Sequence, residues 1–317
     1  MSIYTNTNPE ALNLYRAILP SNHMKKNMAN QGNRDDADSA TALNKVACSQ
    51  LNTVVLANSG EIFIAGSNSY GQLGFKEGKN LPSKPENKDS FLNFFHRIDF
   101  FSLENRKVRT ISCGGEHIFA VTRNEIVFGW GRNDSGQLGL GYIIDQVYEP
   151  MLIRSVADIT VGNIVCGDNY SAIVTSINKL MVAGNLEGGK LGLGKAWQSG
   201  LMLNFMEVPK VGMVKSVCCG PNHMLAICNS KKSNSGNSLY SWGRNWRGQL
   251  GLGNKNDQVV PRQIKMPKNE KFSKVAAGRD FSVALTAKTN RVYVWGNYRY
   301  VCNSKNYMDQ ESPTLLR

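Results

Sequence analysis

Residues 113–141 read CGGEHIFAVTRNEIVFGWGRNDSGQLGLG, and this stretch decides the fold because it recurs along the chain. Similar strings occupy residues 166–194, ending in GNLEGGKLGLG, and residues 219–253, ending in SWGRNWRGQLGLG. Two further copies lie at residues 48–74 and 277–297. A unit that repeats at this length is typical of solenoids and propellers, and the 317-residue chain contains five copies.

The glycines are spaced as regularly as the strings. Every unit places a Gly after the hairpin, and from Gly131 onward the successive steps between these glycines are 53, 59 and 53 residues. A second Gly follows five residues later in most units. Glycine permits positive φ and close backbone approach. We therefore interpret five of these glycines as structural: Gly131, Gly136, Gly184, Gly243 and Gly248.

Within a unit the apolar residues alternate with a period of two. Residues 118–123 alternate in this way, and a turn at Asn124 and Glu125 leads into a second apolar run, which is typical of a β-hairpin. Three or four short strands in a unit of this length build a propeller blade. The sequence predicts an all-β fold, a β-propeller with about five recognisable blades. The predicted blades are residues 45–107, 108–160, 161–213, 214–270 and a degenerate 271–317.

The two GRNxxGQLGLG strings, each preceded by CGxxH, resemble the regulator-of-chromosome-condensation repeat family. The resemblance covers about residues 45–317. It implies a propeller, and members usually have seven blades, so the repeat set here is incomplete. Two blades are absent from the protein, or they are missing from this chain, or degenerate strands lie within residues 1–44 and 75–107.

Two segments lie outside the repeat pattern. Residues 1–44 are predicted to form an arm, part helical and part polar linker. Residues 75–107 are an insertion whose second half is rich in Phe. We expect that half to pack as the closing strand of the first blade, and the alternative is an apolar contact surface for a partner.

Composition excludes several classes of function. The chain has 7 Cys but no CxxC pair, so it predicts neither a disulfide framework nor a zinc site, and we expect no cofactor or metal. The beginning of the chain lacks the pattern of a secretory signal, and no apolar run could span a membrane. We expect a cytoplasmic or nuclear protein without a membrane partner.

The positive charge is unevenly distributed. The formal net charge is +13, and residues 1–165 hold 16 basic and 16 acidic residues, so residues 166–317 carry the whole excess. A basic second half attracts acidic partners, including nucleic acid or chromatin, although it also serves solubility.

Several repeated positions are interpreted as structural. Trp130, Trp242 and Trp295 share one position and are predicted to pack between blades. His117 and His223 share a position that Tyr and Phe occupy in other units, so a structural role is the simpler interpretation. No arrangement of residues indicates catalysis.

The turn around that histidine position is polar and varies between units. In the family's nucleotide-exchange member, acidic residues and His of these turns contact the small GTPase Ran and displace its nucleotide. By resemblance, Glu116, Asp168 and Asp280 would form the acidic set, with His117 and His223 beside them.

One loop combines an aromatic residue with two arginines. Trp246 is flanked by Arg244 and Arg247 in the string RNWRG. Trp and Arg are enriched at interface hot spots, and a cation can stack on the indole. We predict that these three residues contact a partner.

Three functions follow from the sequence and remain open. The propeller regulates a small Ran-like GTPase, and would then act as a guanine-nucleotide exchange factor. Alternatively, it is a non-catalytic scaffold or adaptor, as in a ubiquitin-ligase or tRNA-modification assembly. The third reading is a basic, chromatin-associated binder. An enzyme with its own active site is disfavoured.

Overall fold

The computed structural model describes residues 42–75, 91–197, 200–229, 237–266, 270–297, 299–301 and 308–316. These residues form five four-stranded antiparallel sheets, each a meander in which strands adjacent in sequence pair. This confirms the predicted all-β class and five blades. Each sheet is one blade, numbered 1 to 5 along the chain. Short 3-10 turns connect them in places, the longest spanning three residues.

The strands follow one another in the same way in every blade. Their bounds are as follows: blade 1, β1 Leu43–Cys48, β2 Asn52–Ala57, β3 Ile62–Ser67, β4 Phe91–Arg97; blade 2, β5 Val108–Cys113, β6 His117–Thr122, β7 Val127–Asn133, β8 Ile144–Leu152; blade 3, β9 Val161–Cys166, β10 Tyr170–Thr175, β11 Leu180–Asn185, β12 Leu201–Glu207; blade 4, β13 Val214–Cys219, β14 His223–Asn229, β15 Asn237–Gly243, β16 Gln258–Gln263; blade 5, β17 Phe272–Ala277, β18 Phe281–Thr286, β19 Val292–Gly296, β20 Gln310–Leu315.

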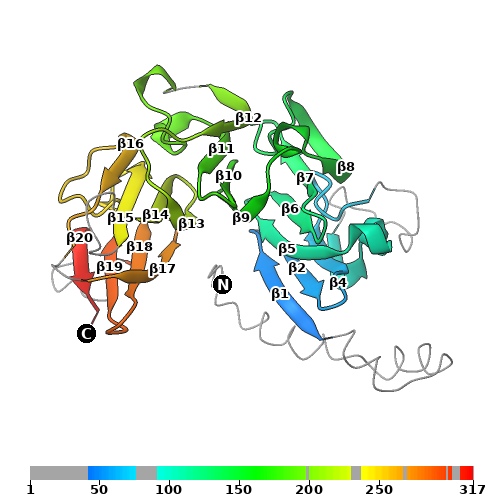
Figure 1. Cartoon of the computed structure of the whole chain (residues 1–317), viewed down its shortest axis with the longest axis horizontal. Helices are drawn as coiled ribbons and strands as arrows, with labels where there is room; N and C mark the ends of the chain where they lie inside the picture. Colours follow the sequence, from blue (N-terminus) through cyan, green and yellow to red (C-terminus); the bar gives the residue numbers. More distant parts are fainter. Residues whose placement is uncertain are drawn as a thin grey trace.

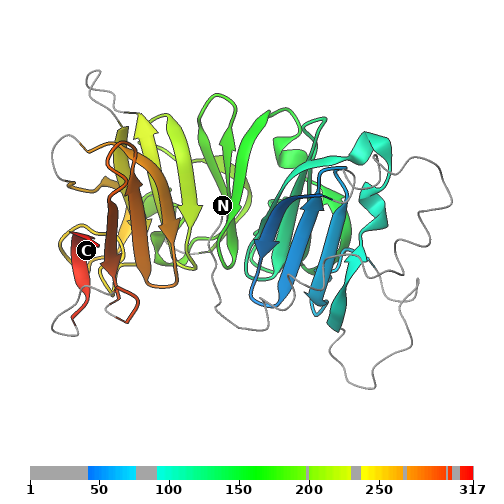
Figure 2. The same cartoon turned by 90° about the horizontal axis from the view of Figure 1, so that it is seen from below.

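The five blades stand around an open arc. Figure 1 shows the first strand of each blade on the inside of the arc and the fourth on the outside. Blades 1 and 5 lie at opposite ends, and Figure 2 shows the same separation from below. In the described part of the chain these two blades do not close the ring.

The core lies between neighbouring blades. One apolar cluster joins blades 1 and 2 and one face of blade 3, a second joins blades 3 and 4, and a third joins blades 4 and 5. Blades 2, 3 and 4 therefore each pack one face against the preceding blade and the other face against the next blade. We call the face that a blade turns toward the next blade its leading face. Stability in such an array comes from contacts between neighbours.

The repeated tryptophans lie at these junctions. Trp130, Trp242 and Trp295 are fully buried. The Trp130 Nε1–H donates to the Gln72 carbonyl oxygen of the preceding blade at 2.8 Å, and Trp295 makes the same bond to Gln249. These two indoles thus tie their blades to the preceding GxLG loops, whereas the buried Trp242 Nε1–H makes no such bond in the described part of the chain.

Glycine is required where this loop begins. The five glycines that the repeat pattern singled out have positive φ, among them Gly243 at +107°. A Cβ at Gly243 would lie 2.4 Å from the Asn222 carbonyl oxygen. No side chain fits there, because the loop leaves the blade directly over the turn before β14.

The segments outside the repeat pattern have different outcomes. Residues 1–41 lie outside the described residues, and β1 begins at Leu43, within the predicted arm. The expected closing strand is confirmed, because β4 pairs with β3. Leu92 on β4 is buried, whereas Phe91 and Phe94 are 55% and 47% exposed. The fifth blade, predicted to be degenerate, has all four strands.

Candidate functional site

The predicted contact residues come together on one end of the blades. In each blade the turn between the first and second strands and the loop after the third strand leave the same end of the sheet. In blade 2, for example, β5 ends at Cys113, β6 begins at His117 and β7 ends at Asn133. We call this end the loop face. It holds the turns of Glu116, Asp168 and Asp280 and the loop of Trp246.

The two histidines of these turns point into the blade junctions. His117 and His223 have no exposed surface. Nε2 of His117 lies 2.8 Å from Ser171 Oγ, and Nε2 of His223 lies 2.9 Å from Ser282 Oγ. Ser171 donates its own proton to the Gln137 carbonyl oxygen, so the histidine is assigned as the donor to the serine.

Burial also keeps these histidines neutral. It lowers the pKa of His117 to about 3 and that of His223 to about 4. A neutral, fully buried imidazole offers no surface to a partner. The suggestion that His117 and His223 contact a partner is therefore wrong, and the structural interpretation of this position holds.

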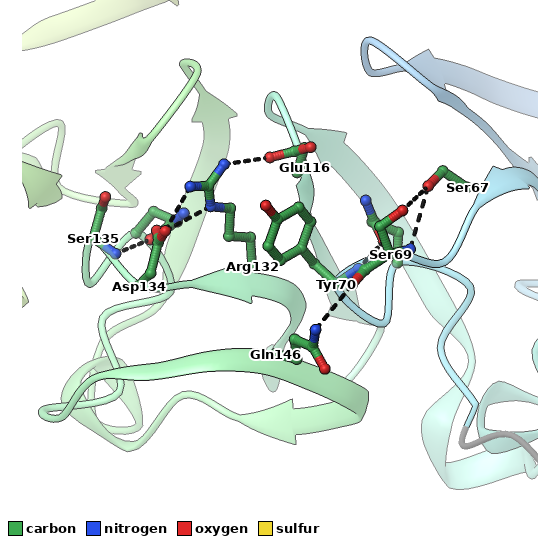
Figure 3. Close-up of polar contacts among 10 residues, drawn as sticks. Ser67, Ser69, Tyr70, Glu116, Arg132, Asp134, Ser135 and Gln146 are labelled. Carbon is green, nitrogen blue, oxygen red and sulfur yellow. Dashed lines mark hydrogen bonds and ion pairs between the residues drawn. The ribbon is translucent and has the colours of Figure 1, made fainter. Parts of the chain in front are cut away.

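Glu116 is occupied within its own blade. Figure 3 shows its carboxylate facing Arg132, whose Nη1 donates to Glu116 Oε2 at 2.6 Å. Arg132 also pairs with Asp134 at 2.6 Å and stacks over the Tyr70 ring, 4.6 Å from its centroid. The hydrogen bond that Arg132 donates to the Asp134 carboxylate is the largest influence on the arginine, and it raises the pKa of Arg132. This cluster fixes the loops of blades 1 and 2 to each other and neutralises Glu116.

Asp168 and Asp280 differ from Glu116 and from each other. Asp168 is exposed, and its backbone carbonyl accepts the Gly115 N–H at 3.3 Å. Asp280 is half-buried, and its Oδ1 accepts the Trp246 Nε1–H at 3.0 Å. The three acidic residues therefore differ in exposure and in hydrogen-bond partner.

Trp246 is exposed, but side-chain contacts hold its ring in place. Its side chain is 55% exposed, its indole N–H is bonded to Asp280 of blade 5, and the Arg244 guanidinium lies 5.8 Å from its ring centroid. Arg244 in turn pairs with Glu187 of blade 3. The chain of contacts from Glu187 through Arg244 and Trp246 to Asp280 spans three blades. An indole fixed in this way needs little ordering on binding.

Trp246 forms one wall of a pocket between blades 4 and 5. The pocket has a volume of about 320 Å³, and we call it the blade 4–5 pocket. Its lining residues come from the loop after β15, the turn between β17 and β18, and the loop after β19: Trp246, Arg247, Arg279, Asp280, Asn297, Arg299 and Tyr300.

The pocket is basic and aromatic. Arg279 is exposed and makes no hydrogen bond or ion pair with the described part of the chain. Arg247 lies 3.7 Å from Asp309, which pairs more closely with Lys255 at 2.8 Å. Tyr300 is half exposed and packs on Phe281 with ring centroids 5.4 Å apart. The arrangement can hold an anion beside an aromatic group.

Sequence reasoning found part of this pocket and missed the rest. Trp246, Arg247 and Asp280 were predicted, and they lie together. Arg299 and Tyr300 were missed because the fifth blade has lost the GxLG ending. Their signal was position, since they follow Gly296 and Asn297 as Trp246 follows Gly243 and Arg244.

The repeated cysteines are not nucleophiles. Burial raises the pKa of Cys113, Cys166 and Cys219, with Cys166 at about 12. A thiol needs a lowered pKa to react as thiolate at neutral pH.

Within the described residues, no helix is long and apolar enough to cross a membrane.

Comparison with known proteins places the chain in a family. The family model of the RCC1-like domain matches residues 18–316. The chain is 30% identical over 270 residues to the Xenopus laevis serine/threonine-protein kinase Nek9, covering 81% of this chain and 26% of Nek9. It is 28% identical over 256 residues to the Arabidopsis thaliana ultraviolet-B receptor UVR8, covering 80% of this chain and 53% of the receptor. The chain thus spans about a quarter to a half of these relatives.

Solved structures share the fold. Human WBSCR16 superposes with a TM-score of 0.69 at 22% identity, covering 87% of this chain and 67% of that one. Yeast RCC1 (Prp20), bound to Kap60, superposes with a TM-score of 0.62 at 19% identity, covering 90% and 76%. This chain belongs to the RCC1-like domain family.

Proposed function

We propose that this propeller is a non-catalytic interaction subunit that recruits an acidic protein partner through the blade 4–5 pocket. The observation that carries the proposal is an exposed Trp246, hydrogen-bonded to Asp280, beside arginines from three separate segments. Exposed Trp and Arg around a pocket are the typical anchors of protein interfaces. The excess charge of residues 166–317 would steer an acidic partner to this end of the arc.

The partner set of the tagged protein in cells tests this proposal. We expect the double variant Trp246→Ala and Arg279→Glu to lose partners that the unaltered chain retains. Lys288→Glu is the matched control, because Lys288 is exposed on blade 5 at the end opposite the loop face. An unchanged partner set in the double variant, with the same melting temperature as the unaltered protein, would contradict the proposal.

Guanine-nucleotide exchange on a Ran-like GTPase is the second candidate. It is supported by the exposed Asp168 and by Asp280 on the same face. The yeast protein Prp20, which shares the fold, is described as binding Gsp1p and histones. The pairing of Glu116 with Arg132 weighs against it, because exchange by this acidic set would need a free carboxylate there.

A nucleotide-release assay decides on exchange activity. Release of labelled GDP from a purified Ran-type GTPase should accelerate on adding the folded propeller, and Asp168→Asn should slow it. No acceleration at micromolar protein would rule exchange out and leave the adaptor role. Binding to histones or DNA that weakens steeply with salt would instead favour chromatin association, and a nuclear rather than cytoplasmic location.

A further inference from the structure

The lining of the blade 4–5 pocket carries a net positive charge. Arg247, Arg279 and Arg299 line it, and Asp280 is the acidic residue of the lining. Asp280 Oδ1 accepts the neutral Trp246 N–H rather than an arginine. Asp309 beside the pocket is nearly buried, and it pairs with Lys255 at 2.8 Å and with Arg247 at 3.7 Å. Arginine stays protonated at all physiological pH values, so this excess is permanent.

The arrangement of the arginines suits a group with several charged oxygens. Each guanidinium comes from a different segment of the lining, and Arg279 offers its planar fork of donors without a partner in the described part of the chain. A carboxylate has two oxygens and one charge, and a single arginine can satisfy it. A phosphomonoester has three oxygens and a charge of about −1.5 to −2, so it can accept from several arginines at once.

The surroundings favour a peptide over a nucleic acid. Asp280 lies within the pocket, and Glu187 and Glu311 lie on adjacent segments of the loop face. These carboxylates interrupt the cationic surface that a chain of successive phosphates would need. Trp246 and Tyr300 supply apolar surface on which the side chains that flank one phosphate could pack.

We propose that the blade 4–5 pocket binds a phosphorylated side chain of a partner polypeptide. The inference rests on the proposed function and specifies the ligand of the same pocket. The phosphate lies between Arg247, Arg279 and Arg299, and the flanking residues of the partner pack on Trp246 and Tyr300. Recognition of single phosphates by clustered arginines is a general mode of peptide binding.

Fluorescence anisotropy with the full chain tests the proposal. The probes are labelled degenerate peptide libraries with a fixed central phosphoserine, phosphothreonine or phosphotyrosine, and the same libraries with Ser, Thr, Tyr or Glu there. At least one phosphorylated library should bind about ten-fold tighter than its unphosphorylated and Glu versions. The three phosphorylated arms show which residue carries the group. Equal affinity for the phosphorylated and Glu libraries, or no binding, would overturn the proposal.

Variants and pH provide independent readouts. Arg279→Glu should abolish the preference for phosphate, Arg279→Lys should retain part of it, and Lys288→Glu should leave it unchanged. Affinity for the phosphorylated library should fall below pH of about 6, where the phosphate becomes a monoanion. A labelled oligothymidine that binds more tightly than every peptide would show a nucleic-acid site instead and overturn the proposal.

The cellular experiment separates this inference from the proposed function. If partners depend on Trp246 and Arg279 and are lost after phosphatase treatment, both stand. If they depend on the pocket but survive phosphatase treatment, the interaction function stands and the phosphate proposal fails. If they do not depend on the pocket, the proposed function fails, whatever the peptides do in vitro.

Discussion

The buried histidines give the protein a defined response to acid. Folded His117 and His223 titrate at about pH 3 and about pH 4 because burial disfavours the imidazolium. In the unfolded chain a histidine binds its proton near pH 6.5. As the pH falls from about 6.5 toward 4, the unfolded state therefore gains protons that the folded state does not, and stability is lost.

This titration predicts a specific effect of replacing His223. Tyr and Phe occupy the same position in blades 3 and 5, so His223→Tyr can be accommodated. We expect the free energy of unfolding of the unaltered protein to fall by about 3 kcal/mol more between pH 7 and pH 4 than that of the variant. Urea unfolding at a series of pH values measures this. Parallel pH profiles would contradict the assignment of a neutral histidine.

Lys190 is another buried titratable residue, and it differs from the residue at the same position in the other loops. Three other loops have Gln here, and its Oε1 accepts a loop N–H, as Gln137 does from Ser135 at 2.9 Å. Lys190 is nearly buried, and burial lowers its pKa to about 8. Lys190→Gln should raise the free energy of unfolding at pH 7 by about 1–2 kcal/mol, because the cost of burying a cation is removed. Lys195→Gln, at an exposed site, should have no effect on the urea midpoint.

At the scale of the element, blade 3 shows how a lost tryptophan is replaced. Its β11 has Ala183 where blades 2, 4 and 5 have Trp. Phe205 from the neighbouring β12 fills the space, since a Cβ at Gly139 would lie 2.6 Å from its ring. The ring also packs on Phe119 of blade 2 at 6.3 Å between centroids. The aromatic contact has moved from the third strand to the fourth.

Phe205→Ala should therefore loosen the junction of blades 2 and 3. We expect a loss of about 3–5 kcal/mol in the free energy of unfolding, typical of a buried Phe replaced by Ala. The double variant with Ala183→Trp should recover part of it, because the indole would occupy the emptied space. Thermal unfolding of both variants checks this. A loss no greater in Phe205→Ala than in the exposed control Phe94→Ala would contradict the replacement.

The same elements show what a single sequence could and could not predict. The five blades were predictable because glycines at fixed spacing and positive φ allow one local path from strand to loop. The position of Trp246 outside the packing positions also marked it as a candidate contact residue; the structure shows that it is exposed, and the contact stays a prediction. The neutralisation of Glu116 was not predictable, because Arg132 could equally have faced a partner. Arg299 and Tyr300 were missed because their loop no longer carries the motif.

At the scale of the whole molecule, the blades differ in how many of their faces are covered. Blade 4 has both faces covered, and its leading-face residues Leu225, Ile227 and Leu239 are at most 1% exposed. The equivalent residues of blade 5, Val283, Leu285 and Val292, are partly exposed. An array stabilised by neighbour contacts is weakest where a neighbour is lacking.

Hydrogen exchange should show this difference between the blades directly. The ladder amides of β18 and β19 in blade 5 should exchange faster than those of β14 and β15 in blade 4, because local opening of blade 5 breaks only one junction. Both pairs are antiparallel hairpins with continuous ladders, so backbone pairing alone predicts equal protection. Mass spectrometry of peptic fragments after a time course measures the rates. Equal protection would mean that the leading face of blade 5 is covered in solution, and protection regained on adding a partner would locate that partner on this face.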